Sequence, residues 1–217
     1  TSDARYLIPI VPYLSEEEFK SDLPAILSLP APALSKAING LFTTKKPPMS
    51  PDRFLIEIHK PRIAKEMKEK AVYAMQICLS EKFFLQYFPY DVTIRAVNVI
   101  VNNKYHDMIM ETLLQITTVS FKNLPKCIKY VLNTLLHTLV NNGITNIPTE
   151  WEVMKELIMK TTPTSYRPVL MILPYEQIKD LIDSNQDIKK YLRNTAEQMK
   201  TKHAAKIHPA VLELLNS

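Results

Sequence analysis

The residues of this chain best suited to acid–base chemistry or metal binding are its histidines, His59, His106, His137, His203 and His208. No two of them lie four residues apart with an acid between them, which is the helix-borne spacing of a zinc protease. His106 precedes Asp107, but an acid at a helix start usually complements the helix dipole. His137 follows Lys129 and Asn133 by eight and four residues, opposite an apolar stripe, so we expect it to face solvent or a partner. The pattern predicts no metal site.

Nucleophiles also lack a supporting motif. A catalytic serine on a sharp strand-to-helix turn needs flanking glycines, and no serine of this chain has them. Cys78 and Cys127 lie among apolar neighbours, which disfavour a thiolate and predict reduced, buried thiols. The chain has only 2 glycines, Gly40 and Gly143, so a glycine-rich phosphate loop is excluded and a turn-rich sheet is disfavoured. We therefore expect no enzyme and no cofactor, with a site assembled from distant residues as the alternative.

Composition is that of an ordinary globular protein. Hydrophobic residues make up 46% and charged residues 23% of the 217 residues, and no apolar run approaches the roughly 20 residues needed to span a bilayer. We find no signal peptide and expect no membrane contact. The absent initiator methionine suggests an excised fragment.

Apolar spacing predicts helices along the whole chain. The clearest stripe recurs with helical period at Ile128, Val131, Leu132, Leu135, Leu136 and Leu139, and Gly143 should end that helix. Ser15 with Glu18, and Thr149 with Glu152, have the spacing of capping boxes. Pro61 should start a helix of about 18 residues. Residues 92–101 and 117–121 are rich in β-branched side chains, but neither alternates as a strand does.

These elements predict an all-α fold. About a dozen helices with short connections favour HEAT-like antiparallel helix pairs that form a compact α-solenoid. The proline-rich stretch 43–51 reads as a loop, so we expect one scaffold domain over residues 1–217.

Charge is unevenly distributed. The chain carries a net charge of +5, and residues 189–206 contain one acid, Glu197, among the bases Lys189, Lys190, Arg193, Lys200, Lys202 and Lys206. This stretch is either a solvated helix face or a surface for phosphates or an acidic partner. Tyr191 falls on the apolar stripe of the same helix, so this stretch has no free aromatic ring for stacking on a base. Sequence-specific RNA recognition is therefore not expected.

A second candidate surface is aromatic. The densest cluster of rings consists of Phe83, Phe84, Tyr87, Phe88 and Tyr90, and it either closes the core between helix pairs or anchors a partner. The candidate partner-binding residues are therefore Phe83, Phe84, Tyr87, Phe88, Lys189, Lys190, Arg193, Lys200 and Lys202.

The order of several segments resembles the carboxy-terminal domain of the symplekin/Pta family. These segments are residues 5–14 (RYLIPIVPYL), 23–30 (LPAILSLP), 33–41, 50–59 (SPDRFLIEIH) and 161–178 (TTPTSYRPVLMILPYEQI). The resemblance covers essentially the whole chain and rests on apolar spacing and proline placement.

The resemblance implies a nuclear, non-catalytic scaffold of pre-mRNA 3′-end cleavage and polyadenylation. The partners it implies are the endonuclease of the cleavage and polyadenylation specificity factor, the inactive homologue of that endonuclease, and the hinge of a cleavage stimulation factor subunit. The alternative is a basic helical module that binds nucleic acid through residues 189–206.

Overall fold

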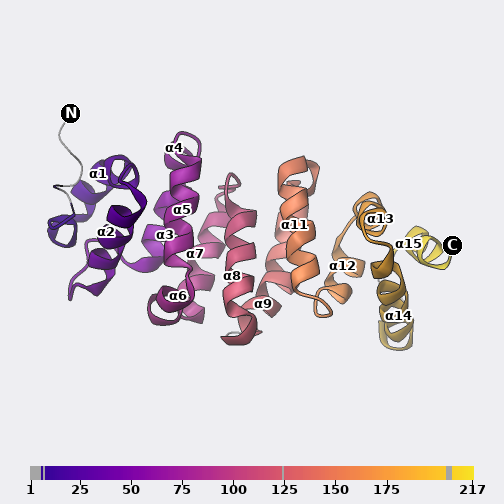
Figure 1. Ribbon diagram of the computed structural model, residues 1–217. Helices are drawn as coiled ribbons and strands as arrows, with labels where there is room; N and C mark the ends of the chain where they lie inside the picture. The colour runs from indigo at the N-terminus through magenta and orange to yellow at the C-terminus, as the bar shows by residue number, and fades with distance from the viewer. Residues whose placement is uncertain (1–5, 7, 124, 204–206) are drawn as a thin grey trace. The chain divides into compact units, whose positions relative to one another are not determined.

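The computed structural model describes residues 6, 8–123, 125–203 and 207–217, with side chains described outside 120–123 and 200–203. Within these residues the chain is helical and contains no strand, which confirms the predicted all-α fold of about a dozen helices (Figure 1). The β-branched stretches at 92–101 and 117–121 are helical. The chain divides into two compact units, residues 1–123 and 124–217. The prediction of a single domain stays a prediction.

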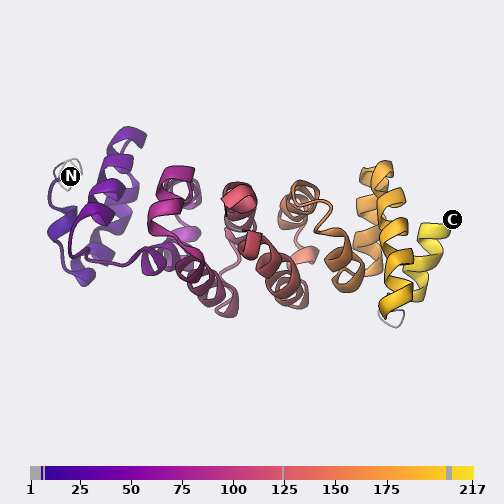
Figure 2. The ribbon, with the colours of Figure 1, turned by 90° about the horizontal axis from the view of Figure 1, so that it is seen from below.

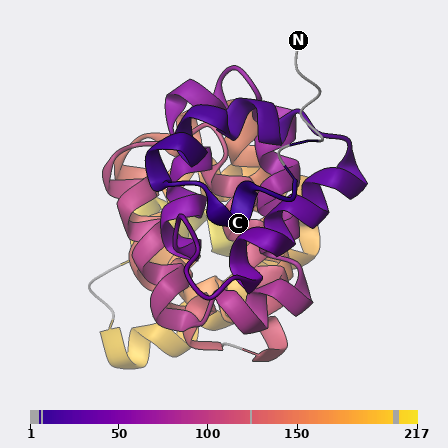
Figure 3. The same ribbon diagram turned by 90° about the vertical axis from the view of Figure 1, so that its left-hand side faces the viewer.

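The first unit is a succession of short helices joined by tight corners. Its elements are the 3-10 turn η2 (Val11–Tyr13) and the helices α1 (Glu16–Leu27), α2 (Ala31–Thr43), α3 (Pro51–His59), α4 (Pro61–Ala64), α5 (Lys68–Cys78), α6 (Glu81–Tyr87), α7 (Tyr90–Asn102) and α8 (Ile109–Asn123). Helix α2 packs against η2, α1 and α5, and α3 packs against α7 (Figures 1 and 3).

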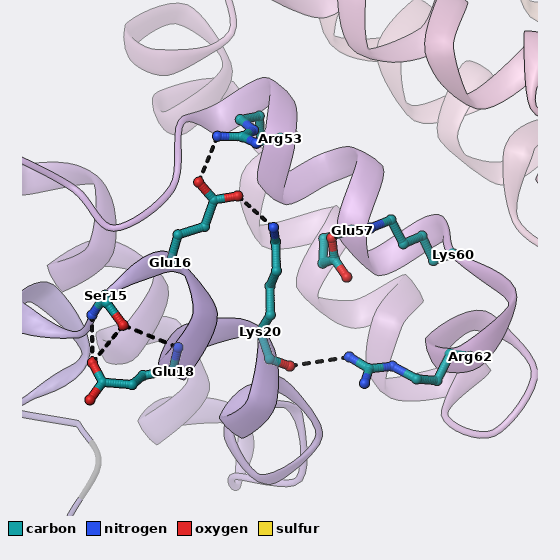
Figure 4. Close-up of polar contacts among 8 residues, drawn as sticks. All are labelled: Ser15, Glu16, Glu18, Lys20, Arg53, Glu57, Lys60 and Arg62. Atoms are coloured by element: carbon teal, nitrogen blue, oxygen red, sulfur yellow. Dashed lines mark hydrogen bonds and ion pairs between the residues drawn. The ribbon is translucent and has the colours of Figure 1, made fainter.

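Helix α1 begins with the predicted capping box. The backbone N–H of Ser15 donates to Glu18 Oε2 at 2.8 Å, and the backbone N–H of Glu18 donates to Ser15 Oγ at 3.2 Å (Figure 4). The Ser15 backbone hydrogen bond is also the main reason why the pKa of Glu18 is lowered. The helix continues past Pro24 to Leu27.

One predicted helix length and one predicted helix start are wrong. The helix expected to run for about 18 residues from Pro61 is interrupted, because Met67 leaves the helical region with φ −135° and separates α4 from α5. The predicted capping box at Thr149 is absent, since Pro148 is already helical and Ile147 takes the cap position. A proline in the first turn has no N–H that needs a cap, and the helix starts two residues earlier than a box with Thr149 at the cap position required.

The second unit continues the same pattern (Figures 1 and 2). Its elements are α9 (Pro125–Tyr130), the π-helical turn η3 (Val131–Leu135), α10 (Leu136–Asn141), the 3-10 turn η4 (Ile144–Asn146), α11 (Pro148–Lys160), α12 (Tyr166–Ile172), α13 (Tyr175–Ser184), α14 (Gln186–His203) and α15 (Pro209–Asn216). Helix α14 packs against α12, α13 and α15.

The clearest predicted helix is present and contains a π turn. Helix α9, η3 and α10 follow one another without a break over residues 125–141, and all six residues of the predicted apolar stripe are buried. The backbone N–H of Leu136 donates to Val131 O, which is the five-residue step of a π-helix. Gly143 ends the segment with φ +79°, as predicted.

Candidate partner-binding surfaces

The aromatic cluster splits into buried and half-buried rings. Phe84 and Phe88 are fully buried, so the prediction of a partner anchor is corrected for these two side chains. The Phe88 ring lies 6.1 Å from that of Phe42, in an edge-to-face arrangement. Phe83 and Tyr87 are half-buried, with ring centroids 5.6 Å apart, and Tyr87 also lies 5.5 Å from Phe42. The cluster therefore closes the core of the first unit and leaves two rings at its margin.

The predicted basic stretch is only partly a free surface. Lys190 is exposed and Lys189 is half-buried. Arg193 Nε donates to the backbone oxygen of Leu215 at 2.5 Å, so this guanidinium fixes the last turn of α15 to α14. Lys200 and Lys202 lie outside the residues whose side chains are described.

Tyr191 is not on the buried side of α14, which corrects the sequence-based placement. Its side chain is 52% exposed and stacks on Tyr166 with centroids 5.8 Å apart and an interplanar angle of 6°. The apolar stripe of α14 consists of Ile188, Leu192, Ala196 and Met199, which are buried. An exposed tyrosine therefore stands next to Lys190.

Several charges in the first unit are matched by partners. Glu16 accepts from Lys20 at 2.5 Å and from Arg53 at 2.6 Å, and Arg62 donates to the backbone oxygen of Lys20 (Figure 4). Lys20 is also the main cause of the lowered pKa of Glu16. Along residues 60–70, Lys60 pairs with Glu57 and Lys68 pairs with Glu111. These paired basic residues contribute to holding the fold together.

The second unit has a hollow with unmatched positive charge. It lies between the 125–141 helical segment and α12, has a volume of about 570 Å³, and is lined by Lys129, Asn133, His137, Thr164, Arg167, Pro168, Met171 and Ile172. We call it the α12 groove. Lys129, His137 and Arg167 are exposed. Within the described part of the chain, neither Lys129 nor Arg167 has an ion-pair partner, and no carboxylate lines the groove.

The π turn sets the spacing of one groove wall. Two turns of an α-helix take about seven residues, whereas one α turn followed by one π turn takes about eight. Lys129 and His137 are eight residues apart and η3 lies between them, so both side chains face the same hollow, with Asn133 between them. Asn141 Nδ2 lies 3.2 Å from His137 Nδ1 and holds the ring. The prediction that His137 faces outward, opposite the apolar stripe, is confirmed.

Sequence reasoning found one wall of the α12 groove and missed the other. The Lys129, Asn133 and His137 spacing was visible in the sequence. Arg167 and Met171 come from a helix more than 25 residues further along, and only the packing of α10 against α12 brings them to the same hollow. The only available signal was the Arg167 charge within an otherwise apolar helix.

No metal-type cluster appears among the residues described. No three His, Cys, Asp or Glu side chains there are close enough to share an ion, and Cys78 and Cys127 are buried thiols that are not joined in a disulfide. Burial raises the pKa of the Cys78 thiol, so its thiolate is strongly disfavoured. In the same residues, no helix combines the length and the apolar character that crossing a bilayer requires.

Comparison with known protein families matches residues 3–185 to the family described as "Symplekin tight junction protein C terminal". The chain belongs to the symplekin carboxy-terminal family. The resemblance noted in the sequence is thereby confirmed, and membership associates the chain with scaffolding in mRNA 3′-end processing. No solved structure matches the chain.

Some of the candidate surface residues lie inside the region matched to the symplekin family, and others lie outside it. The half-buried rings Phe83 and Tyr87 and all residues that line the α12 groove lie inside residues 3–185. Lys189, Lys190 and Arg193 lie beyond the matched region. The groove is therefore part of the symplekin-type region of the chain, and the basic stretch is not.

Proposed function

We propose that this chain is a non-catalytic, nuclear scaffold of the pre-mRNA 3′-end cleavage and polyadenylation machinery. Its partners are the endonuclease of the cleavage and polyadenylation specificity factor, the inactive homologue of that endonuclease, and the hinge of a cleavage stimulation factor subunit. The observation that carries the proposal is the family match over residues 3–185.

One feature of the structure gives no support to a catalytic role, and another supports a binding role. Burial is the main cause of the lowered pKa values of two histidines, His59, which is enclosed in the core, and His106. The open features of the surface are instead suited to protein contact, since the second unit has a groove with basic and apolar walls. We place the partner contacts at this groove and at Phe83, Tyr87, Lys189 and Lys190.

The test is capture of purified partners by the immobilised 217-residue chain. We expect retention of the endonuclease together with its inactive homologue, and separately of the stimulation factor hinge. A helical-repeat protein of similar positive charge is the control, because a chain with a pI of about 9.0 attracts acidic proteins without specificity. If the chain retains none of these partners beyond the control, the proposed function is wrong.

The exposed Tyr191 favours a second candidate function, RNA contact by residues 189–206. An exposed ring beside Lys190 provides the stacking surface that the sequence pattern did not predict. Binding through this stretch should weaken steeply between about 50 and about 200 mM salt, because phosphate contacts release counterions.

Replacing Lys189 and Lys190 by Glu, and separately Tyr191 by Ser, tests the RNA candidate. Arg193 is left unchanged because it fixes α15. RNA affinity that is insensitive to salt and to both variants would rule this candidate out.

A further inference from the structure

We propose that the α12 groove binds an acidic, extended segment of a partner protein, with Lys129 and Arg167 pairing with its carboxylates. This inference rests on the proposed scaffold function and specifies the chemistry of one of its contacts.

The first argument is charge complementarity. Lys129 and Arg167 approach the groove from opposite walls, one from α9 and the other from α12. Lys60, Lys155 and Arg53, by contrast, are each paired with a carboxylate of the chain itself. Lys129 and Arg167 have no such ion pair within the described chain, so each can form one with a carboxylate of another molecule.

The second argument is the mixed lining of the groove. Met171 is a large apolar side chain with 36% exposure, and it lies one helical turn beyond Arg167 on α12. Pro168 and Ile172 continue this apolar strip, and Asn133 and His137 supply hydrogen-bonding groups on the opposite wall. A peptide whose acidic residues alternate with aliphatic ones matches this arrangement, because its carboxylates meet the cations while an aliphatic side chain covers Met171.

The third argument separates a peptide from a nucleic acid. Phe, Tyr and Trp, whose rings are the usual stacking platforms for bases, are not among the residues found to line the groove, which offers only the smaller planar groups of His137 and Arg167. The stacked pair of Tyr166 and Tyr191 is not among the lining residues either. A volume of about 570 Å³ is within the usual range of ligand sites and holds a few peptide side chains.

The test measures fluorescence anisotropy of a labelled peptide of Asp-Glu-Leu-Ser repeats titrated with the full chain. A peptide of Asn-Gln-Leu-Ser repeats and a short oligouridylate are the comparison probes. We expect the acidic peptide to bind most tightly. The paired charge reversal Lys129→Glu with Arg167→Glu should weaken that binding about tenfold or more, because each lost carboxylate pair is replaced by like-charge repulsion.

A matched control has the same change in net charge. Lys82 and Lys179 are exposed, have no ion pair in the described structure and do not line the groove, so Lys82→Glu with Lys179→Glu should retain wild-type affinity. Met171→Ser should weaken binding of the acidic peptide and leave the salt dependence unchanged. Circular dichroism establishes that each variant is folded.

Three outcomes would overturn the inference: no binding of the acidic peptide, equal weakening by the two charge-reversal pairs, or tighter binding of the oligouridylate. Its failure is distinguishable from failure of the scaffold function. If wild-type chain captures the endonuclease pair while the acidic peptide does not bind, only the groove assignment is wrong.

Discussion

At the scale of single residues, His59 is a structural tie within the core of the first unit. It is fully buried, with Nδ1 2.7 Å from Leu55 O and Nε2 2.8 Å from Thr112 Oγ1. A carbonyl only accepts, so Nδ1 carries the hydrogen of the neutral ring, and Nε2 faces the Thr112 hydroxyl, whose single hydrogen is shared with Met108 O at 3.0 Å. The imidazole links α3 to α8, and burial lowers its pKa to about 4. Nothing near His59 in the sequence indicates a partner 53 residues away.

His59 should make stability depend on pH. In the unfolded chain the ring takes up a proton below about pH 6.5, whereas the folded ring stays neutral down to about pH 4. The unfolded state therefore binds more protons in this interval, and the free energy of unfolding should fall by about 3 kcal/mol as the pH drops from about 6.5 to about 4. Urea unfolding at several pH values measures this slope.

The His59→Gln variant identifies the source of that slope. We expect lower stability at pH 7 and a flatter pH dependence, because the variant removes the buried imidazole. A residual slope in His59→Gln is expected from His106, whose pKa is also lowered. An unchanged slope in His59→Gln would contradict the assignment.

The two glycines should respond oppositely to alanine. Gly143 has φ +79° and ends the 125–141 segment, so Gly143→Ala should cost about 1–2 kcal/mol of stability. Gly40 lies inside α2, and a Cβ there would meet Pro12 Cγ at 3.4 Å, so Gly40→Ala should be neutral or stabilising. Thermal melts of the two variants measure the difference, and equal shifts would show that the left-handed conformation has no energetic consequence.

At the scale of elements, an acid on α13 fixes α11. Asp180 Oδ2 accepts from Trp151 Nε1 at 2.7 Å and from Lys155 Nζ at 3.0 Å. These two hydrogen bonds, Trp151 first, lower the pKa of Asp180, and Lys155 also lies over the Trp151 ring. The contact joins residues 29 positions apart, so sequence spacing could not reveal it.

Removing this tie should loosen α13. Asp180→Ala leaves the nearly buried Trp151 N–H without its acceptor and should cost about 1–2 kcal/mol, whereas Asp180→Asn keeps an acceptor and should cost less. Asp183→Ala, at an exposed position of the same helix, should change stability by less than about 0.5 kcal/mol. Chemical unfolding followed by Trp151 fluorescence compares the three variants. Equal costs for Asp180→Ala and Asp183→Ala would contradict the role of the tie.

Helix existence was easier to predict than helix detail. The stripe from Ile128 to Leu139 has the same apolar pattern whether a turn closes after four or five residues, so the π turn was not predictable from it. The break at Met67 was also missed, because apolar residues continue on both sides of it.

At the scale of the whole molecule, the open question is how the two units unfold. We retain the expectation of one domain, which predicts a single calorimetric transition whose van't Hoff and calorimetric enthalpies agree. His59→Ala, a change within residues 1–123, should then lower the melting temperature of that one transition. Two transitions, of which His59→Ala shifts only one, would show that residues 1–123 and 124–217 are separate domains.

The sequence alone determined the fold class, the family and the absence of any catalytic motif. Helical period, proline corners and the shortage of glycine are local properties of the chain, and the family resemblance is built from the same local features. The sequence did not reveal which aromatic rings are buried. Nor did it reveal that Arg193 fixes α15 or that Arg167 faces Lys129 across the α12 groove. Those facts depend on which helix packs against which, and packing joins residues whose separation along the chain leaves no periodic signal.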